Sequence, residues 1–154
     1  MANNENNVAA EENLQVVAFK LRNEEYGVSI LNVQEIRNLT DITRVPFAQD
    51  FIKGVINLRG SVLPVIDLKK RLGLQNTEYT ADTRIVIVKS DDIEVGMIVD
   101  AVTEVITLDA EHIDASKVVD NESNRFIRGI GKENDRLIIM LNLEEIIGLQ
   151  DEAK

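Results

Sequence analysis

Apolar residues recur at every second position in several short segments, the period of β-strands that bury one face. In residues 15–21, the strongly apolar side chains from Val17 to Leu21 alternate with smaller or charged ones. A polar turn at 23–25 separates this segment from a second apolar stretch over 26–30. The two stretches therefore predict a β-hairpin near the N-terminus.

The pattern after this hairpin is also that of short strands. Residues 31–37 fit either a helical turn or a third strand, and the β-branched Val33 and Ile36 favour a strand after one turn. Further apolar strands are predicted over 52–56 and 62–66. Short strands with turn signals about every 8–12 residues are typical of β barrels and sandwiches rather than of βαβ units.

One helix signal interrupts the strands. Asp67 can cap a short helix over 68–72. Gly73 can end that helix, because glycine adopts the left-handed conformation common just beyond a helix C-terminus. The helix is too short to change the fold class, so an all-β fold is predicted.

The second half of the chain repeats the order of these signals. A shift of 69 residues aligns the two halves, and a six-residue insertion raises the shift to 75. Asp67 then meets Asn142, and both residue types are good helix caps. Ordered glycines and a repeated cap, helix and glycine favour a duplicated fold over a coincidence between two Val/Ile-rich segments. The identical pairs are Val17 and Val86, Lys20 and Lys89, Glu25 and Glu94, Gly27 and Gly96, Val33 and Val102, Glu35 and Glu104, Leu39 and Leu108, Ile52 and Ile127, Gly54 and Gly129, Leu68 and Leu143, Gly73 and Gly148, and Leu74 and Leu149.

A duplicated β pattern of this length predicts two small barrels packed on each other. The first is expected at about 14–80, with contributions from the C-terminal end, and the second at about 81–149. Each is near the size at which a lone core is marginal, so apolar contact between the barrels should supply part of the stability. Residues 1–13 predict a disordered acidic tail, and 150–154 a frayed C-terminus.

Composition and charge remove several functional classes. The 154 residues include no cysteine and one histidine, His112, which excludes disulfides, thiol nucleophiles and multi-histidine metal centres. A net charge of −10 opposes binding to nucleic acid. No apolar run approaches the ~20 residues of a membrane span, and the N-terminus lacks the features of a secretory signal. We expect a cytoplasmic protein with no direct membrane insertion.

Signatures of catalysis are incomplete. The segment Gly54–Ser61 resembles a phosphate-binding loop but lacks the Gly-Lys-Ser/Thr ending whose lysine reaches the phosphates. Gly129 and Gly131 lack the third glycine of a dinucleotide-binding turn. His112 lies in a polar stretch and is predicted to be a surface residue. The sequence therefore predicts no enzyme and no cofactor, and Asp/Glu chemistry in a cleft between the barrels is a weak alternative.

The loop predicted at 57–61 breaks the symmetry of the repeat. Its Asn57-Leu58-Arg59-Gly60 run has Lys132-Glu133-Asn134-Asp135 at the corresponding place in the second half. Arginine presents a rigid five-donor fork suited to carboxylates or carbonyls of a partner, and glycine permits a tight turn. Arg59 could instead pair internally with Glu35 or Asp67. Both interpretations remain open on the sequence alone.

Two segments carry a family resemblance. The runs Tyr26–Arg37 and Ile52–Leu68, which include Asn-Leu-Arg-Gly and Pro-Val-Ile-Asp-Leu, strongly resemble the CheW family of chemotaxis coupling proteins. The similarity covers residues 14–149. It implies two five-stranded SH3-like β-barrels and a non-enzymatic adaptor in chemotaxis signal transduction. A scaffold subunit of another signalling complex is the alternative.

The resemblance also implies partners and contact residues. The partners would be the cytoplasmic tips of methyl-accepting chemotaxis receptors and the histidine kinase CheA, through its regulatory SH3-like domain. The loop from Ala110 to Val119, in the region of the insertion, is expected to contact the kinase through Ile113 and Val119. The expected receptor-binding residues are Val33, Glu35, Arg37, Lys53, Gly54, Asn57, Arg59, Gly60 and Gly96.

Overall fold

The computed structural model of the chain describes residues 13–75, 78–114 and 125–148. The predicted tail up to residue 12, the predicted frayed end at 150–154 and Val119 lie outside these residues. The described part contains eleven strands and four short helices. They are β1 (Asn13–Leu21), β2 (Glu24–Ser29), η1 (Ile30–Asn32), β3 (Val33–Asn38), β4 (Ile52–Leu58), β5 (Ser61–Asp67), α2 (Leu68–Arg71), β6 (Arg84–Ser90), β7 (Ile93–Val99), β8 (Ala101–Asp109), η2 (Ala110–His112), β9 (Ile113–Asp114), β10 (Ile127–Glu133), β11 (Arg136–Leu141) and α3 (Leu143–Ile147).

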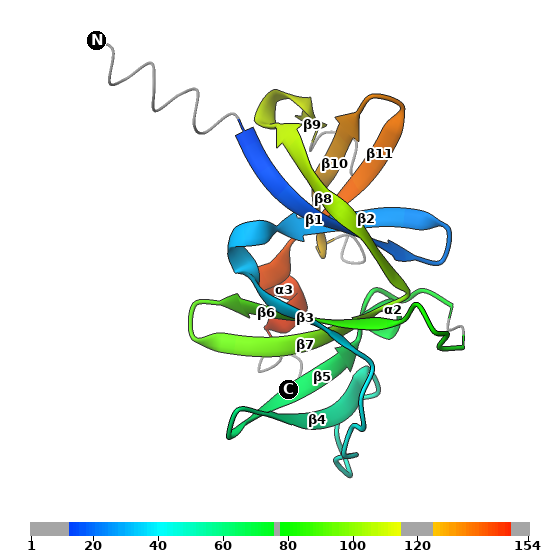
Figure 1. Cartoon of the computed structure of the whole chain (residues 1–154), viewed down its shortest axis with the longest axis vertical. Coiled ribbons are helices and arrows are strands. Elements are labelled where there is room, and N and C mark those ends of the chain that lie inside the picture. The colour runs from blue at the N-terminus through cyan, green and yellow to red at the C-terminus, as the bar shows by residue number, and fades with distance from the viewer. Residues whose placement is uncertain (1–12, 76–77, 115–124, 149–154) are drawn as a thin grey trace.

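The strands form two sheets, one above the other in Figure 1, with α3 between them. The upper sheet, barrel A, has the order β8-β1-β2-β11-β10-β9, and the lower sheet, barrel B, has the order β3-β6-β7-β5-β4. In each sheet one pair is parallel, β2 with β11 and β5 with β7, and the other pairs are antiparallel. The all-β fold of two SH3-like barrels predicted from the sequence is confirmed; barrel A gains a sixth strand, the two-residue β9.

The repeat is confirmed in its details. Strands β1, β2, β3, β4 and β5 match β6, β7, β8, β10 and β11, and the two sheets place the matched strands in the same order. The register of β3 against β6 shifts between Val33 and Glu35, and that of β8 against β1 shifts between Val102 and Glu104, the residues 69 positions later. Duplicated irregularities of this kind indicate duplicated backbone geometry, not only a similar apolar pattern.

The division of the chain between the barrels was predicted wrongly. Barrel B is the continuous segment β3 to β7, at 33–99, whereas barrel A combines the hairpin β1–β2 with β8 to β11. Each barrel thus takes its β1–β2 or β6–β7 hairpin from one repeat and its remaining strands from the other. The chain leaves barrel A at η1. After this turn it enters β3, which pairs with β6 of barrel B instead of continuing the β1–β2 hairpin.

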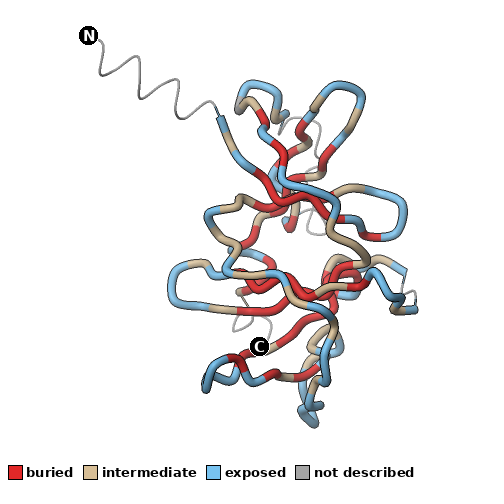
Figure 2. The backbone as a smooth tube through the Cα atoms, in the orientation of Figure 1, coloured by how far each residue is buried: buried red, intermediate tan, exposed pale blue. Residues whose placement is uncertain are grey.

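The largest apolar cluster lies between the barrels. It includes Phe19 and Tyr26 of barrel A, whose rings stack with centroids 6.4 Å apart, and Val86 and Met97 of barrel B. Each barrel also has a smaller interior cluster of its own, around Ile138 in barrel A and formed by residues of β4, β5, β6 and β7 in barrel B. Figure 2 shows buried residues along the strands of both sheets, including the strands that face each other. The predicted apolar contact between the barrels is confirmed.

Most local predictions also agree with the structure. The turn η1 precedes β3, as expected for 31–37, and the Asp67 carboxylate accepts a hydrogen bond from the Lys70 amide at the start of α2. The predicted loop at 57–61 is the exception, because only Arg59 and Gly60 lie between β4 and β5. A two-residue turn with left-handed backbone lets the flanking residues continue the strand ladder.

Arg71 joins the two barrels inside the molecule. Its Nε and Nη2 donate to the carbonyls of Ile146 and Glu145 at the end of α3, each over 3.0 Å. Its guanidinium also lies 4.3 Å from the ring centroid of Phe51 and 4.8 Å from that of Phe126. Phe51 and Phe126 are equivalent positions in the repeat, so one cation contacts the same point of both halves.

Replacing this arginine should therefore weaken the whole fold. We expect Arg71→Met to lower the free energy of unfolding by about 2–4 kcal/mol, because the carbonyls of Ile146 and Glu145 lose a charged donor and the two rings lose the Arg71 cation. Urea denaturation measures the change. Arg22→Met, at an exposed turn, is the control and should stay near wild type; an equal loss in both variants would contradict this role of Arg71.

Candidate functional site

The β4–β5 turn displays the residues that the sequence singled out. Arg59 has φ 52° and Gly60 has φ 86°, as in a type I′ turn, and Leu58 pairs with Ser61 across it. The Asn57 side-chain oxygen accepts a hydrogen bond from the Gly60 amide over 3.1 Å. Asn57 and Gly60 thus shape the turn, and Arg59 is the residue that the turn projects outward.

Arg59 reaches across to the edge of barrel B. Its Nη2 donates to Glu35 Oε1 on β3 over 2.6 Å, and Arg37 Nη1 lies 3.6 Å from the other oxygen of the same carboxylate. The Glu35 side chain is 25% exposed, whereas that of Arg59 is 74% exposed. The three side chains form a surface cluster with one carboxylate between two guanidinium groups, hereafter the Glu35 cluster.

The structure shows which acid pairs with Arg59 inside the chain. Its internal partner is Glu35, since Asp67 is buried and bonds to Tyr79 and to the cap of α2. The ion pair joins β3 to the turn after β4, the two edge strands of barrel B. An exposed pair of this kind contributes only about 0–1 kcal/mol to stability. Arg59 therefore has a partner within the chain and still presents most of its surface to solvent.

A groove of about 400 Å³ lies where the barrels meet, close to the start of β3. Residues of both barrels line it, among them Leu14 of β1 and Ser90 of β6, and Leu31 of η1 is 86% exposed beside it. Val33, the residue directly after η1, packs against the core between the barrels. Leu31 was not predicted as a surface residue. The sequence does contain a sign of its exposure, because Ile30 and Leu31 are adjacent and an alternating strand pattern buries only one of two neighbouring side chains.

Two predicted receptor contacts are corrected because both glycines are buried. At Gly54 an added Cβ would lie 2.2 Å from the carbonyl oxygen of Thr43, so the chain's own backbone already occupies the space beside it. At Gly96 an added Cβ would lie 2.9 Å from Ile85 Cγ2, inside barrel B. These glycines permit close packing within the barrel, and they do not line a surface.

The remaining predicted residues lie elsewhere on the surface. Lys53 is exposed at the far end of β4 from Arg59, with its Nζ 5.2 Å from the ring centroid of Tyr79. Ile113 lies on β9 at the open end of barrel A, where it lines a cavity of about 700 Å³ with Leu137, which is 61% exposed. The structure thus separates Lys53 and Ile113 from the Glu35 cluster.

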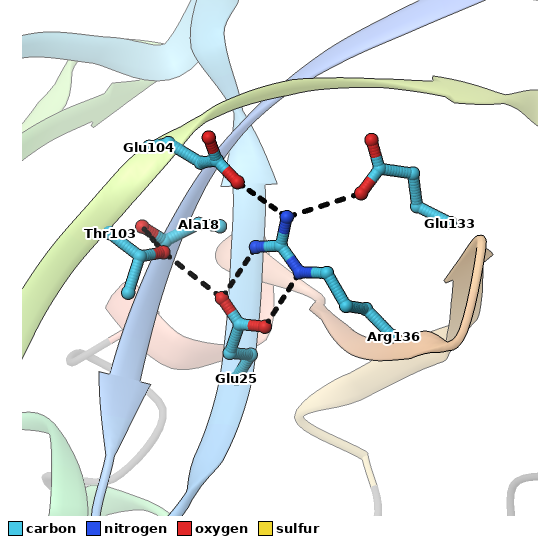
Figure 3. A network of polar contacts seen from close by, with 6 residues as sticks. All are labelled: Ala18, Glu25, Thr103, Glu104, Glu133 and Arg136. Carbon is cyan, nitrogen blue, oxygen red and sulfur yellow. Dashed lines mark hydrogen bonds and ion pairs between the residues drawn. The ribbon is translucent and has the colours of Figure 1, made fainter.

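A second ionic cluster, around Arg136 in barrel A, was not predicted (Figure 3). Arg136 Nε and Nη2 donate to the two oxygens of Glu25 over 3.0 and 2.7 Å, and its Nη1 contacts Glu104 and Glu133. Thr103 Oγ1 lies 3.0 Å from both Glu25 Oε2 and the Ala18 carbonyl. Glu104 is the repeat equivalent of Glu35, so each barrel pairs this glutamate with an arginine at its β4–β5 or β10–β11 hairpin.

The Arg136 cluster perturbs its central carboxylate. Hydrogen bonds from Arg136 hold the pKa of Glu25 below its usual range, with a further contribution from Thr103, and these effects exceed the opposing effect of burial. A carboxylate with a lowered pKa in the folded state stabilises the fold above its unfolded pKa of about 4.3. That contribution is lost as the pH falls through the lower folded value.

The contribution of Glu25 to the free energy of unfolding should therefore decrease as the pH is lowered. We expect Glu25→Gln to cost about 1–2 kcal/mol at pH 7, where two charge-assisted hydrogen bonds are lost. The cost should become progressively smaller as the pH falls below the unfolded pKa of about 4.3 and through the lower folded pKa. Urea denaturation from pH 7 to pH 3 measures both values. Glu78→Gln, at an exposed carboxylate, is the control. A difference between wild type and Glu25→Gln that stays constant over this range would contradict the assignment.

Metal binding and membrane insertion find no support in the described segments. Within residues 13–75, 78–114 and 125–148, no three His, Cys, Asp or Glu side chains are grouped so that they could hold a metal ion. The three glutamates around Arg136 instead contact its guanidinium. No helix in the same residues is long and apolar enough to cross a membrane.

Comparisons with known proteins agree with this picture. The model of the CheW-like domain family matches residues 15–151. The chain is 39% identical over 137 residues to the chemotaxis protein CheW of Helicobacter pylori, covering 89% of this chain and 83% of that protein, and 40% identical over 134 residues to CheW of Bacillus subtilis, covering 86% of each. The crystal structure of the scaffolding protein TtCheW from Thermoanaerobacter tengcongensis superimposes with a TM-score of 0.81 at 41% identity, covering 86% of this chain and 91% of that one.

Proposed function

Because this chain belongs to the CheW family, we propose that it is a chemotaxis scaffold that couples methyl-accepting receptors to the histidine kinase CheA. It acts by binding alone and catalyses no reaction. Both proposed contacts lie on the cytoplasmic side of the membrane, where the receptor tips and the kinase meet, so the protein works in the cytoplasm. The relatives and the structural neighbour, named as chemotaxis and scaffolding proteins, support this role.

The observation that carries the receptor contact is the Glu35 cluster. Glu35 orients Arg59 over 2.6 Å, and the type I′ turn fixes its backbone, so its exposed guanidinium is positioned before a partner arrives. A preorganised side chain loses less entropy on binding. We assign receptor contact to Glu35, Arg37 and Arg59, with Asn57 and Gly60 shaping the turn.

The groove between the barrels extends this contact. Val33 lies two residues before Glu35 on β3, and the exposed Leu31 stands at the edge of the groove. An apolar centre flanked by charged residues is the usual plan of a binding hot spot. A helical receptor tip could cover the apolar side chains at Leu31 and Val33 while its polar groups bond to Arg59.

The kinase contact is assigned to the cavity of barrel A. Ile113 and Leu137 border the open cavity of barrel A, where apolar side chains are exposed beside Glu111, Asp114 and Lys132. The cavity lies in barrel A and the Glu35 cluster in barrel B, and Ile113 also lines the groove between the barrels. One protein could therefore hold both partners at the same time.

Two substitutions separate the proposed contacts. Arg59→Ala should lower receptor affinity by about 1–3 kcal/mol, the scale of a lost charged hydrogen bond, and leave kinase binding near wild type. Leu137→Asp, at a residue that borders the cavity of barrel A but not the groove, should do the reverse, because it places a charge in the apolar contact. Calorimetric titrations of each variant against a receptor signalling fragment and against the regulatory domain of CheA give both affinities.

Melting temperatures of both variants serve as the folding control. Since the Arg59 pair is exposed, we expect Arg59→Ala to melt within a few degrees of wild type. Unchanged receptor affinity in folded Arg59→Ala protein would reject the receptor site. Wild-type protein that binds neither partner would reject the coupling function and would favour a scaffold of another complex.

A further inference from the structure

The most exposed aromatic side chain of barrel B lies outside both proposed contacts. Phe47 is fully exposed, in the loop of residues 44–50 that precedes β4, hereafter the Phe47 loop. Its φ is 65°, in the left-handed region that bulky residues rarely adopt. An exposed phenylalanine in such a conformation costs free energy and stabilises no core. Strained positions of this kind are often functional sites.

The Phe47 loop is held at both ends. On one side, the amide and carbonyl of Thr43 bond to the carbonyl and amide of Val55 over 2.9 and 2.8 Å. On the other, the Ile52 amide donates to Gln49 over 3.0 Å and the Asp67 amide donates to Phe51 over 2.8 Å. The phenylalanine is therefore displayed from an anchored loop. Preorganisation of this kind reduces the entropic cost of binding.

The charges around the loop oppose those of the chain as a whole. An open cavity of about 610 Å³ beside Phe47 is bordered by the exposed cations Arg44, Lys53 and Lys70. Of the two acids that border it, Asp50 lies 3.6 Å from Lys70 and Asp67 is buried at the α2 cap. An excess of exposed cations in a protein of net charge −10 indicates a ligand that carries negative charge.

We propose that the Phe47 loop and this cavity bind an acidic segment of a partner protein that carries an apolar side chain among its carboxylates. Phe47 and the exposed Val45 would cover the apolar side chain. Arg44 and Lys53 would bond to the carboxylates. A small inorganic anion fits less well, because it would leave the aromatic ring exposed. The proposal does not depend on the receptor and kinase contacts assigned above, since it uses neither the Glu35 cluster nor barrel A.

The test uses short peptides and the full-length protein. The probe is the acetylated, amidated peptide Glu-Glu-Leu-Leu-Glu-Glu, with two controls, one with every Glu replaced by Gln and one with both Leu replaced by Ser. Amide chemical shifts in nuclear magnetic resonance spectra report where each peptide binds. We expect shifts in the Phe47 loop and at Lys53, and about tenfold weaker binding of either control peptide.

Two variants test the side chains without a risk to folding. Phe47→Asn should weaken binding of the acidic peptide about tenfold and leave the melting temperature equal or higher, because asparagine tolerates a left-handed backbone. Arg44→Gln should weaken binding and reduce its dependence on salt. Val105→Thr, at an exposed apolar residue on β8 of barrel A, is the matched control and should bind as wild type does.

Four results would overturn the proposal. One is equal binding of the acidic and Gln peptides, and another is peptide binding that Phe47→Asn leaves unchanged. A third is the absence of any shift in the Phe47 loop at millimolar peptide. The fourth is concentration-dependent shifts at the same residues without peptide, since these would assign the surface to a second copy of this chain.

Discussion

Strands β1 and β6 are buried on both faces along most of their length, and this burial links the two barrels into one folding unit. In each strand, alternate side chains point into the barrel and into the core between the barrels: Val16 and Ile85 inward, Phe19 and Val86 toward the other sheet. Because each barrel contains a hairpin from the other repeat, neither half of the sequence can complete a barrel by itself. The relative position of the barrels is therefore part of the fold.

A rigid arrangement of this kind suits a protein whose function is to hold partners at fixed positions. The Glu35 cluster, the groove beside Leu31 and the cavity beside Ile113 lie on elements that the shared core holds together. Arg71 adds a polar link, because its guanidinium bonds to α3 and contacts equivalent phenylalanines of both halves. The structure thus offers several binding surfaces in one fixed geometry. The buried residues stabilise the fold, and the exposed edges are available for recognition.

Much of this architecture can be predicted from short-range signals in the sequence. The alternation of apolar residues, the cap at Asp67 and the aligned glycines depend on local geometry and gave the strands, the helix and the repeat. The exchange of hairpins could not be predicted in this way. Alternating apolar residues are compatible with pairing of β1 either to β3 of its own repeat or to β8 of the other repeat, and only the tertiary fold selects β8. Gly54 and Gly96 were misassigned for a related reason. The sequence does not show whether the space beside a glycine is filled by a partner protein or by the chain itself, here by Thr43 and Ile85. The pairing of Arg59 with Glu35 was one of two options on the sequence, and only the closure of barrel B selects it.

We propose that this chain works only by joining a receptor to a kinase. The most direct test of this proposal is autophosphorylation of CheA, measured with receptor-containing vesicles in the presence and absence of this protein. We expect strong stimulation only when receptor, kinase and this protein are combined, and neither ATP hydrolysis nor phosphate transfer by this protein alone. Full receptor control of the kinase without it, or phosphotransfer by the isolated chain, would show that the protein does not act as a coupling scaffold.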